Sequence, residues 1–409
     1  MQHTPSPPAF TFDNDKLRSR CVCLLIVLSF SYSSIKWASI SIAGSLLGLP
    51  VENLSAAVTT LYGLFIGICV LNRSFRLTAD FILLAALILC MWSLSLVSNT
   101  SHGSYYIQVL GGFLASVPYY VLGRTLSDYR TLDKYLGPTA ILISISMFFF
   151  LIVYHIGAGK SYSQTASYLV YPAMIISAAK LFDRFTLLQF ANLVVAVFLL
   201  FAAGSRAPIV LFVLFIVVKA GFTLMAYKNW PLILFYLGLI GGTIFYFSDV
   251  LLLFLLEKLS SYNVSVRLLE RLVKGDMLED DARVRILAAA QHQLAEHPWL
   301  GIGLSNDRIL IARAEADQNV YGHYPHNFLY EILLHYGLIA GSILLLLFAW
   351  LLYHTIIKNK DRYARDINLI FLFIGFMPLL VSGSYLTSPL FFLFLGITIN
   401  TFFHQQSIR

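Results

Sequence analysis

The chain has 409 residues, of which 58% are hydrophobic and only 12% are charged, and its mean hydropathy is +0.76. This composition excludes a soluble globular domain, in which about 25% of residues carry charge. The net charge of +7 alone would suit a nucleic-acid partner. Lys and Arg are instead scattered in short clusters between apolar segments, so we expect no nucleic acid among the partners. The composition predicts a membrane protein.

Apolar segments follow one another from residue 21 almost to the C-terminus. A spanning helix needs roughly 20 mostly apolar residues, which predicts an all-α, polytopic fold of about 12 transmembrane helices. The expected spans are residues 21–36, 53–72, 79–97, 105–123, 136–155, 165–182, 187–203, 207–227, 231–254, 327–355, 367–384 and 388–404. Residues 39–50 are interpreted as an extension of the first span or an interfacial element. Because Lys16, Arg18 and Arg20 precede the first span and no small-residue cleavage site is evident, we expect this span to remain as an anchor.

The basic residues of the short loops predict the orientation, because positive charge resists translocation. With the N-terminus in the cytoplasm, only Lys36, Lys160 and Arg206 fall in short outer connections. Lys219, inside a span, is expected to snorkel to the cytoplasmic side. The opposite side then receives a long polar segment. The predicted organisation is nine membrane helices in residues 1–257, an outer loop cap in residues 258–325 and three membrane helices in residues 326–409, with both termini cytoplasmic.

The outer segment is expected to be a small helical cap rather than a disordered loop. Residues 282–294 contain good helix formers, with Val284, Leu287, Ala288 and Leu294 falling near one face. Pro298 ends this helix, and the two following glycines permit a tight turn back toward the membrane. Farther on, Gly337 and Gly341 are spaced four apart, which predicts a close seam between neighbouring helices.

Two groups of arginines could carry chemistry on the outer face. Arg206 lies at the junction of the seventh and eighth spans, where it either anchors the interface or offers a planar fork to phosphate oxygens. Arg283 and Arg285 lie two apart on the predicted cap helix and therefore point to different sides, so only one is expected to face the site. The sequence leaves open which of the two does so, and a solvated helix face remains an alternative for both.

A third group lies at the outer start of the tenth span, in Tyr324-Pro325-His326-Asn327. His326 could simply cap the helix or lie at the interface. Alternatively, a neutral imidazole could accept the proton of an attacking hydroxyl, because its pKa lies near ambient pH. Asn327 and Glu331 are four apart on one helix face and could orient a polar substrate, together with Tyr324. Two arginines and one base on the same membrane side are what transfer from a lipid diphosphate requires, and the arginines could stabilise the leaving group without a metal.

These residues resemble the O-antigen ligase and O-antigen polymerase superfamily of bacterial membrane glycosyltransferases. The resemblance is carried by Arg206, by Arg283 with Leu287, Pro298 and Gly301, and by His326-Asn327 followed, after nine intervening residues, by Gly337. Ligases of this family continue with Gly, Thr or Tyr three positions after that last glycine, whereas this chain has Ala340.

The resemblance implies an O-antigen ligase of lipopolysaccharide biosynthesis in the bacterial inner membrane, with a periplasmic active site. Such an enzyme transfers a glycan from undecaprenyl diphosphate to the lipid A-core with inversion, without metal or other cofactor. Arg206 and Arg283 would hold the diphosphate and His326 would activate the acceptor, with Arg285 a weaker candidate. The lipid tail of the donor would lie in the membrane, so membrane lipid is also an expected partner.

Three alternatives stay open from the sequence. A polymerase of the same superfamily would pass the glycan to a second lipid-linked repeat unit. A lipid-glycan transporter or flippase would move it without chemistry, although the paired polar interruptions typical of transporters are not evident. A nucleotide-sugar glycosyltransferase would need a metal site, for which Asp13 and Asp15 lie in a short tail without a nucleotide-binding domain around them.

Overall fold

The computed structural model describes residues 14–47, scattered positions between 82 and 95, and residues 103–151, 164–203, 205–224, 281–314 and 324–407. In these parts the chain forms helices and no strands, so the all-α prediction holds there. The expected spans 53–72 and 231–254 lie outside the described residues, and span 79–97 is described only at scattered positions.

The longer helices coincide with the expected spans. They are α1 (Asn14–Leu47), α4 (Gly103–Arg124), α5 (Tyr129–Leu151), α6 (Gln164–Asp183), α7 (Leu187–Ala203), α8 (Ala207–Leu224), α14 (Phe328–Leu352), α15 (Arg362–Phe371) and α16 (Pro389–Ser407). Short π and 3-10 segments extend two of them: η4 (Tyr353–Ile357) after α14, and η5 (Leu372–Phe376) and η6 (Met377–Leu380) after α15. Within the described residues, 7 helices are long and apolar enough to cross a membrane. α7 is shorter than those, and the apolar segment after residue 39 continues α1, as the extension interpretation expected.

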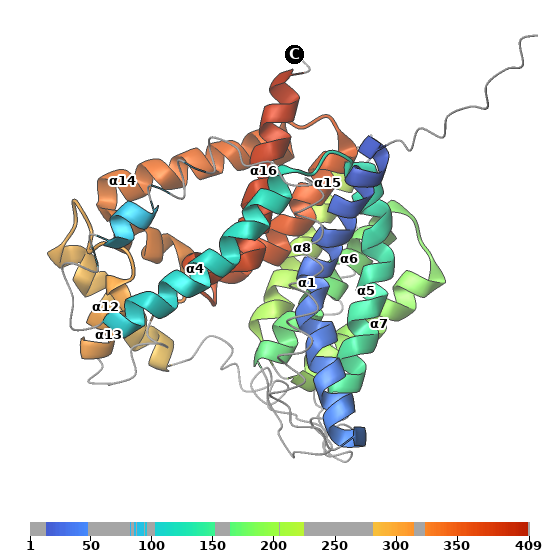
Figure 1. Ribbon diagram of the computed structural model, residues 1–409, viewed down its shortest axis with the longest axis horizontal. Helices are drawn as coiled ribbons and strands as arrows, with labels where there is room; N and C mark the ends of the chain where they lie inside the picture. Colours follow the sequence, from blue (N-terminus) through green and yellow to red (C-terminus); the bar gives the residue numbers. More distant parts are fainter. Residues whose placement is uncertain are drawn as a thin grey trace, which may run out of the picture.

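Two groups of helices make up the fold (Figure 1). α1, α5, α6, α7, α8 and α15 form a bundle on one side, and α4 packs along α16 beside it. α14 crosses the upper end of this pair, and the small helices α12 (Asp281–Glu296) and α13 (Asn306–Ala314) lie near its first turns. The helices interlock through aromatic rings such as Phe215 with Phe373, whose centroids are 5.1 Å apart.

Contacts at the two ends of α4 show which segments lie at each end of the membrane helices. At its last turn Arg124 Nη1 donates to Asn400 Oδ1 at 3.3 Å, and the following Ser127 bonds to Ser19 at 3.2 Å. At its first turn Tyr105 Oη donates to the carbonyl of Ser305, 3.0 Å away. The chain ends therefore gather at one end of the helices, and the α12–α13 segment lies at the other.

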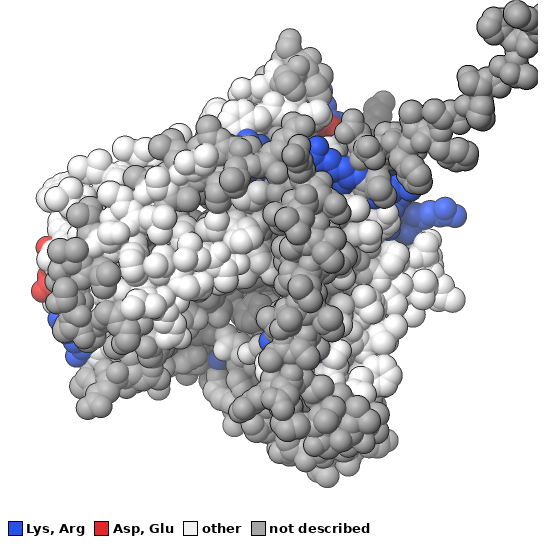
Figure 2. Space-filling model, viewed as in Figure 1, with Lys and Arg blue, Asp and Glu red and all other residues white. Residues whose placement is uncertain are grey.

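Paired charges mark the end that carries the chain termini, where Lys and Arg also gather on the surface (Figure 2). Lys219 of α8 is buried and its Nζ lies 3.0 Å from Asp366 Oδ2 and 3.6 Å from Asp183 Oδ1. Arg362 completes the group, with Nη2 at 2.6 Å from Asp183 Oδ1. Lys219 thus reaches two carboxylates instead of snorkelling to water, because a buried ammonium needs a partner.

The α12–α13 segment attaches to the membrane helices through a break in α14. Gly337 adopts φ 74° and ψ 175°, so the helix is interrupted at that residue. The break frees the carbonyls of Leu334 and His335, which accept from Ile302 N at 2.7 Å and Gly303 N at 3.3 Å. Leu338 N donates in turn to the carbonyl of Pro298 at 2.7 Å.

Two features of the structure differ from the sequence-based expectations. Gly337 does not form a helix–helix seam, because its close neighbours are backbone atoms of Trp299 and Gly301 in the incoming loop. On α12 the buried residues are Ile286 and Ala290, whereas Val284 is 62% exposed. The face of α12 that packs inward is therefore rotated from the predicted one, since contact with Leu334 and Ile311 selects it.

Candidate functional site

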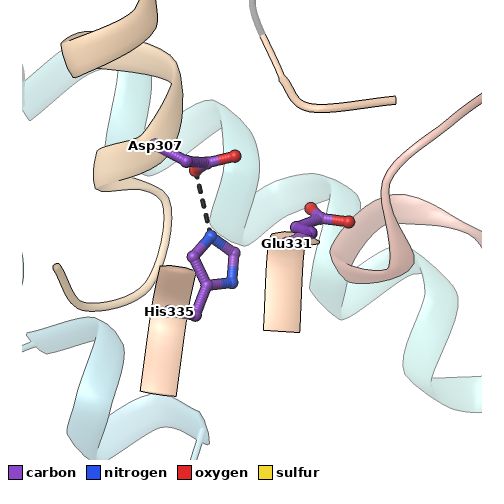
Figure 3. Close-up of side chains that lie close together, drawn as sticks. All are labelled: Asp307, Glu331 and His335. Carbon is purple, nitrogen blue, oxygen red and sulfur yellow. Dashed lines mark hydrogen bonds and ion pairs between the residues drawn. The ribbon is translucent and has the colours of Figure 1, made fainter. Parts of the chain in front are cut away.

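A buried polar cluster lies where α13, α14 and the turn before α16 meet (Figure 3). Asp307 stands in the first turn of α13, and Glu331 and His335 lie four apart on one face of α14. Their exposed fractions are 1%, 2% and 0%. One ligand-type atom from each lies within 4.8 Å of the other two. Burying three ionisable side chains is costly unless each finds partners.

His335 is held from both sides. Its Nε2 lies 3.0 Å from Asp307 Oδ1, and its Nδ1 lies 2.9 Å from the hydroxyl of Tyr385. A carboxylate only accepts, so we assign the Nε2 proton to the bond with Asp307. The amide of Ser305 also points at Nε2, but at 3.4 Å it is the weaker partner. In the neutral imidazole, Nδ1 then accepts the Tyr385 proton.

Glu331 is tied to the turn before α16. Ser384 Oγ donates to Glu331 Oε1, and the Tyr385 amide donates to Oε2 at 3.2 Å. Tyr385 itself, in η7 (Tyr385–Thr387), is fixed by the ring of Phe328, whose centroid is 5.8 Å away. In this structure the carboxyl group of Glu331 accepts from a side chain and a backbone amide of the protein itself, and a role of Glu331 in orienting substrate stays a prediction.

Charges surround the cluster and set its protonation. Burial alone would raise the pKa of Asp307, but attraction and a hydrogen bond from His335, with further attraction from Arg308, outweigh it and lower that pKa. Burial raises the pKa of Tyr385 well above its usual range. Burial alone would lower the pKa of Arg308, yet Tyr105, Asp307 and Glu331 together raise it. The cluster therefore holds an ionised Asp307 beside a charged Arg308.

The residues before α14 form the wall of this site. Asn327 is the N-cap, and its Oδ1 accepts from Leu329 N at 2.9 Å and Tyr330 N at 3.3 Å. This explains why an Asn follows His326, because a capping oxygen satisfies amides of the first turn. His326 has φ 52°, and its ring centroid lies 4.1 Å from that of Tyr324. The Tyr324 ring also lies against Arg308, whose guanidinium carbon is 4.9 Å from the ring centroid.

The predicted arginines lie on different elements. Arg206 immediately precedes α8, 13 residues before Lys219, or about 20 Å along a helix. Because Lys219 pairs at the end that carries the chain termini, Arg206 lies toward the opposite end, to which the α12–α13 segment also belongs. Arg283 lies in the first turn of α12, where its side chain is outside the described residues, and Arg285 is exposed. α12 contacts both α13 and α14, whereas α8 contacts α6 and η6.

Sequence reasoning missed several of the clustered residues. Asp307 and Arg308 lie in a segment without apolar periodicity, and Ser384 and Tyr385 lie more than 50 positions after Glu331 along the chain. His335 is four residues after Glu331, which places both on one face of a helix and was the available signal. Only the fold brings the other residues to that face.

Asp307, Glu331 and His335 are also residue types that bind divalent cations. The sequence predicted no metal site, so this grouping is a finding of the structure. Two features favour a hydrogen-bonded acid–base cluster instead. Both ring nitrogens of His335 are engaged by Asp307 and Tyr385. In addition, the guanidinium of Arg308 would repel a cation in the same space.

Comparisons with known proteins agree with the resemblance seen in the motifs. The family model described as O-antigen ligase matches residues 191–345. No curated protein and no solved structure matches the chain. The matched segment runs from α7 into α14 and contains Arg206, Arg283, Asp307, His326 and His335. Residues 191–345, which contain Asp307, Glu331 and His335 of the buried cluster, are thus similar to the O-antigen ligase family.

Proposed function

We propose that this protein is an O-antigen ligase, which transfers a glycan from undecaprenyl diphosphate to the lipid A-core at the periplasmic face of the bacterial inner membrane. The observation that carries the proposal is the buried Asp307–His335–Glu331 cluster beside His326, inside the segment that matches the family. Perturbed, buried acid–base groups gather at functional sites. Here they lie at the end of the helices opposite the chain termini.

The orientation follows from the charges. The end that carries the chain termini also holds Arg124, Arg130, Lys134, Arg362 and Arg365, which the positive-inside rule assigns to the cytoplasm. α12 and α13 then face the periplasm. An enzyme working there has no nucleotide sugar at hand, so a donor carried on a lipid diphosphate fits the location.

In the proposed reaction the acceptor hydroxyl attacks the anomeric carbon and the bond to the diphosphate oxygen breaks. His326 takes the hydroxyl proton, and the electron pair of the broken bond leaves on the diphosphate. Arg206 and Arg283 stabilise that negative charge, which makes a metal unnecessary. Attack from the face opposite the leaving group inverts the configuration at the sugar. Arg285, Asn327, Glu331 and Tyr324 form the surroundings of the site.

The test is the surface polysaccharide of a strain that lacks the gene, complemented with wild-type protein or with Arg206→Ala, Arg283→Ala or His326→Ala. Lipid-linked polymer that accumulates beside bare core supports a ligase. Core bearing one repeat unit shows a polymerase and refutes the ligase assignment. Wild-type polysaccharide from any two of the alanine variants refutes the proposed roles, provided that immunoblots find the proteins in the membrane at equal levels.

A further inference from the structure

Three side chains near the start of α14 form a chain of contacts from Arg308 through Tyr324 to His326. The guanidinium carbon of Arg308 lies 4.9 Å from the ring centroid of Tyr324. The ring of His326 also contacts that of Tyr324, with 4.1 Å between centroids and a tilt of 46° between the ring planes. A cation over an aromatic ring and two rings in contact are both attractive arrangements. Arg308 therefore reaches His326 through Tyr324.

Arg308 is well suited to hold this chain of contacts in place. Only 8% of it is exposed, and it belongs to α13 rather than to the segment that carries His326. Its neighbour Asp307 binds His335 at 3.0 Å, which pins the first turn of α13 to α14. Two consecutive residues of α13 are thus linked to two histidines that lie nine positions apart in the chain: Asp307 contacts His335 directly, and Arg308 contacts Tyr324, which contacts His326.

The backbone at His326 needs such support. Its φ of 52° lies in the left-handed region, as does that of Ser305 with 66°, and these are the non-glycine residues with positive φ in the described part of the chain. Such conformations cost free energy and persist where surrounding contacts enforce them. Along the chain, Ser305 lies three residues before Arg308 and His326 lies two residues after Tyr324.

We propose that Arg308 is a positioning residue for His326, acting through the ring of Tyr324, so that the cap helix α13 is an integral part of the reaction site. This inference rests on the proposed function, in which His326 accepts the proton of the acceptor. Arg308 sets where the imidazole lies, and it does not itself bind the donor diphosphate.

The experiment measures kcat and KM for the lipid-linked donor with the full-length protein in lipid nanodiscs. The variants are Arg308→Gln, Arg308→Lys, Tyr324→Leu and Tyr324→Phe. Arg313→Gln is the matched control, because it removes the same charge from an exposed position in the last turn of α13. Displacement of a catalytic group by about 1 Å can cost about 100-fold in rate. Arg308→Gln and Tyr324→Leu are expected to lower kcat by about 10- to 100-fold with little change in KM.

Conservative variants separate positioning from folding. Arg308→Lys keeps the cation and Tyr324→Phe keeps the ring, so each is expected to recover much of the kcat that Arg308→Gln or Tyr324→Leu loses. Arg313→Gln is expected to keep the wild-type kcat. If Arg308→Gln raises KM at unchanged kcat, Arg308 contacts the donor and the inference is overturned. Wild-type kinetics in both Arg308→Gln and Tyr324→Leu overturn it as well.

A second measurement does not depend on activity. Diethyl pyrocarbonate modifies accessible imidazoles, and peptide mass spectrometry reports the rate at His326. We expect the rate to rise several-fold in Arg308→Gln and Tyr324→Leu and to stay unchanged in Arg313→Gln. An unchanged modification rate in Arg308→Gln and Tyr324→Leu contradicts the contact of Arg308 with His326 through Tyr324. If His326→Ala remains active while the modification rates change as expected, the proposed function fails and the positioning contact stands.

Discussion

The break in α14 gives the sharpest test of how the cap is attached, through the substitution Gly337→Ala. With φ 74° and ψ 175°, Gly337 occupies a region that is essentially restricted to glycine. An added Cβ would lie 2.1 Å from the Trp299 carbonyl oxygen and 2.7 Å from Gly301 N. These are backbone atoms, so no side-chain rotation relieves the clash. The cap must move away or α14 must change course.

The cost can be worked out from the contacts. Forcing a side chain into that backbone conformation costs about 1–3 kcal/mol. Moving the cap away also breaks the bonds Ile302 N to Leu334 O, Gly303 N to His335 O and Leu338 N to Pro298 O. Each contributes about 1 kcal/mol net. The 2.1 Å clash with the Trp299 carbonyl oxygen adds to this backbone strain, so retaining the docked cap is the costlier choice. We therefore expect the variant to undock the cap and to lose the three bonds, at a cost of about 3 kcal/mol.

Limited trypsin digestion of the full-length protein measures the undocking. Arg308 is 8% exposed, so the wild-type bond after Arg308 is protected, while Arg313 in the same helix is exposed and serves as internal reference. A cost of about 3 kcal/mol corresponds to a change of about 100-fold in the docking equilibrium. Cleavage after Arg308 is expected to accelerate strongly in Gly337→Ala, as read by mass spectrometry of the fragments.

The control is Gly111→Ala in α4, where an added Cβ has no neighbour within 4 Å. Alanine is the better helix former, so this variant should keep or slightly raise stability. If Gly337→Ala leaves both the cleavage rate after Arg308 and the thermal stability at wild-type values, the docking of the cap through the helix break is refuted.

Three further predictions concern the charged groups. The bond from Asp307 to His335 should make Asp307→Asn less stable by about 1.5–3 kcal/mol at neutral pH. The pKa of Asp307 is lowered in the folded state from its ordinary 3.8. The added stability of the wild type is therefore complete above pH 3.8 and is lost as the pH falls through the pKa of the folded state. The unfolding curves of the wild type and of Asp307→Asn should accordingly converge below pH 3.8. Lys219→Met alone leaves the Asp366 carboxylate buried without the Lys219 ammonium. The double variant Lys219→Met/Asp366→Leu should therefore lose less stability than the two single variants lose together. In a double-mutant cycle measured by thermal unfolding, we expect a difference of about 0.5–3 kcal/mol. Glycan transfer should persist in EDTA, since Arg308 and the engaged His335 disfavour a cation, and activity lost on chelation and restored by a divalent ion would contradict this.

The helices could be predicted from the sequence because a long apolar segment in a bilayer has few structural alternatives to a spanning helix. Span 187–203 coincides with α7, and the predicted helix at residues 282–294 is α12. Loop chemistry was readable too, since Pro298 and the glycines after it do turn the chain back, with φ 70° at Gly301 and 83° at Gly303. These features are local, so their residue types suffice to predict them.

The contacts between segments distant in the chain could not be predicted from the sequence. Gly337 looked like a residue for helix packing, and only the incoming Trp299 reveals that it opens the helix to a loop. Asp307 gave no signal, because an acidic residue in a polar segment is ordinarily solvated. Its burial against His335 arises from the docking of α13, which depends on backbone bonds that no side-chain pattern encodes.

The central claim is that this membrane protein performs glycosyl transfer with His326 as the base. The most direct measurement uses purified protein in nanodiscs with a lipid diphosphate-linked glycan and an acceptor glycolipid, and counts free lipid diphosphate released per glycan joined. We expect the wild type to release one lipid diphosphate for each glycan that it joins, and His326→Ala to join glycans at least about 100-fold more slowly. Glycan that changes leaflet with no diphosphate released, or a His326→Ala protein as active as the wild type, would contradict it.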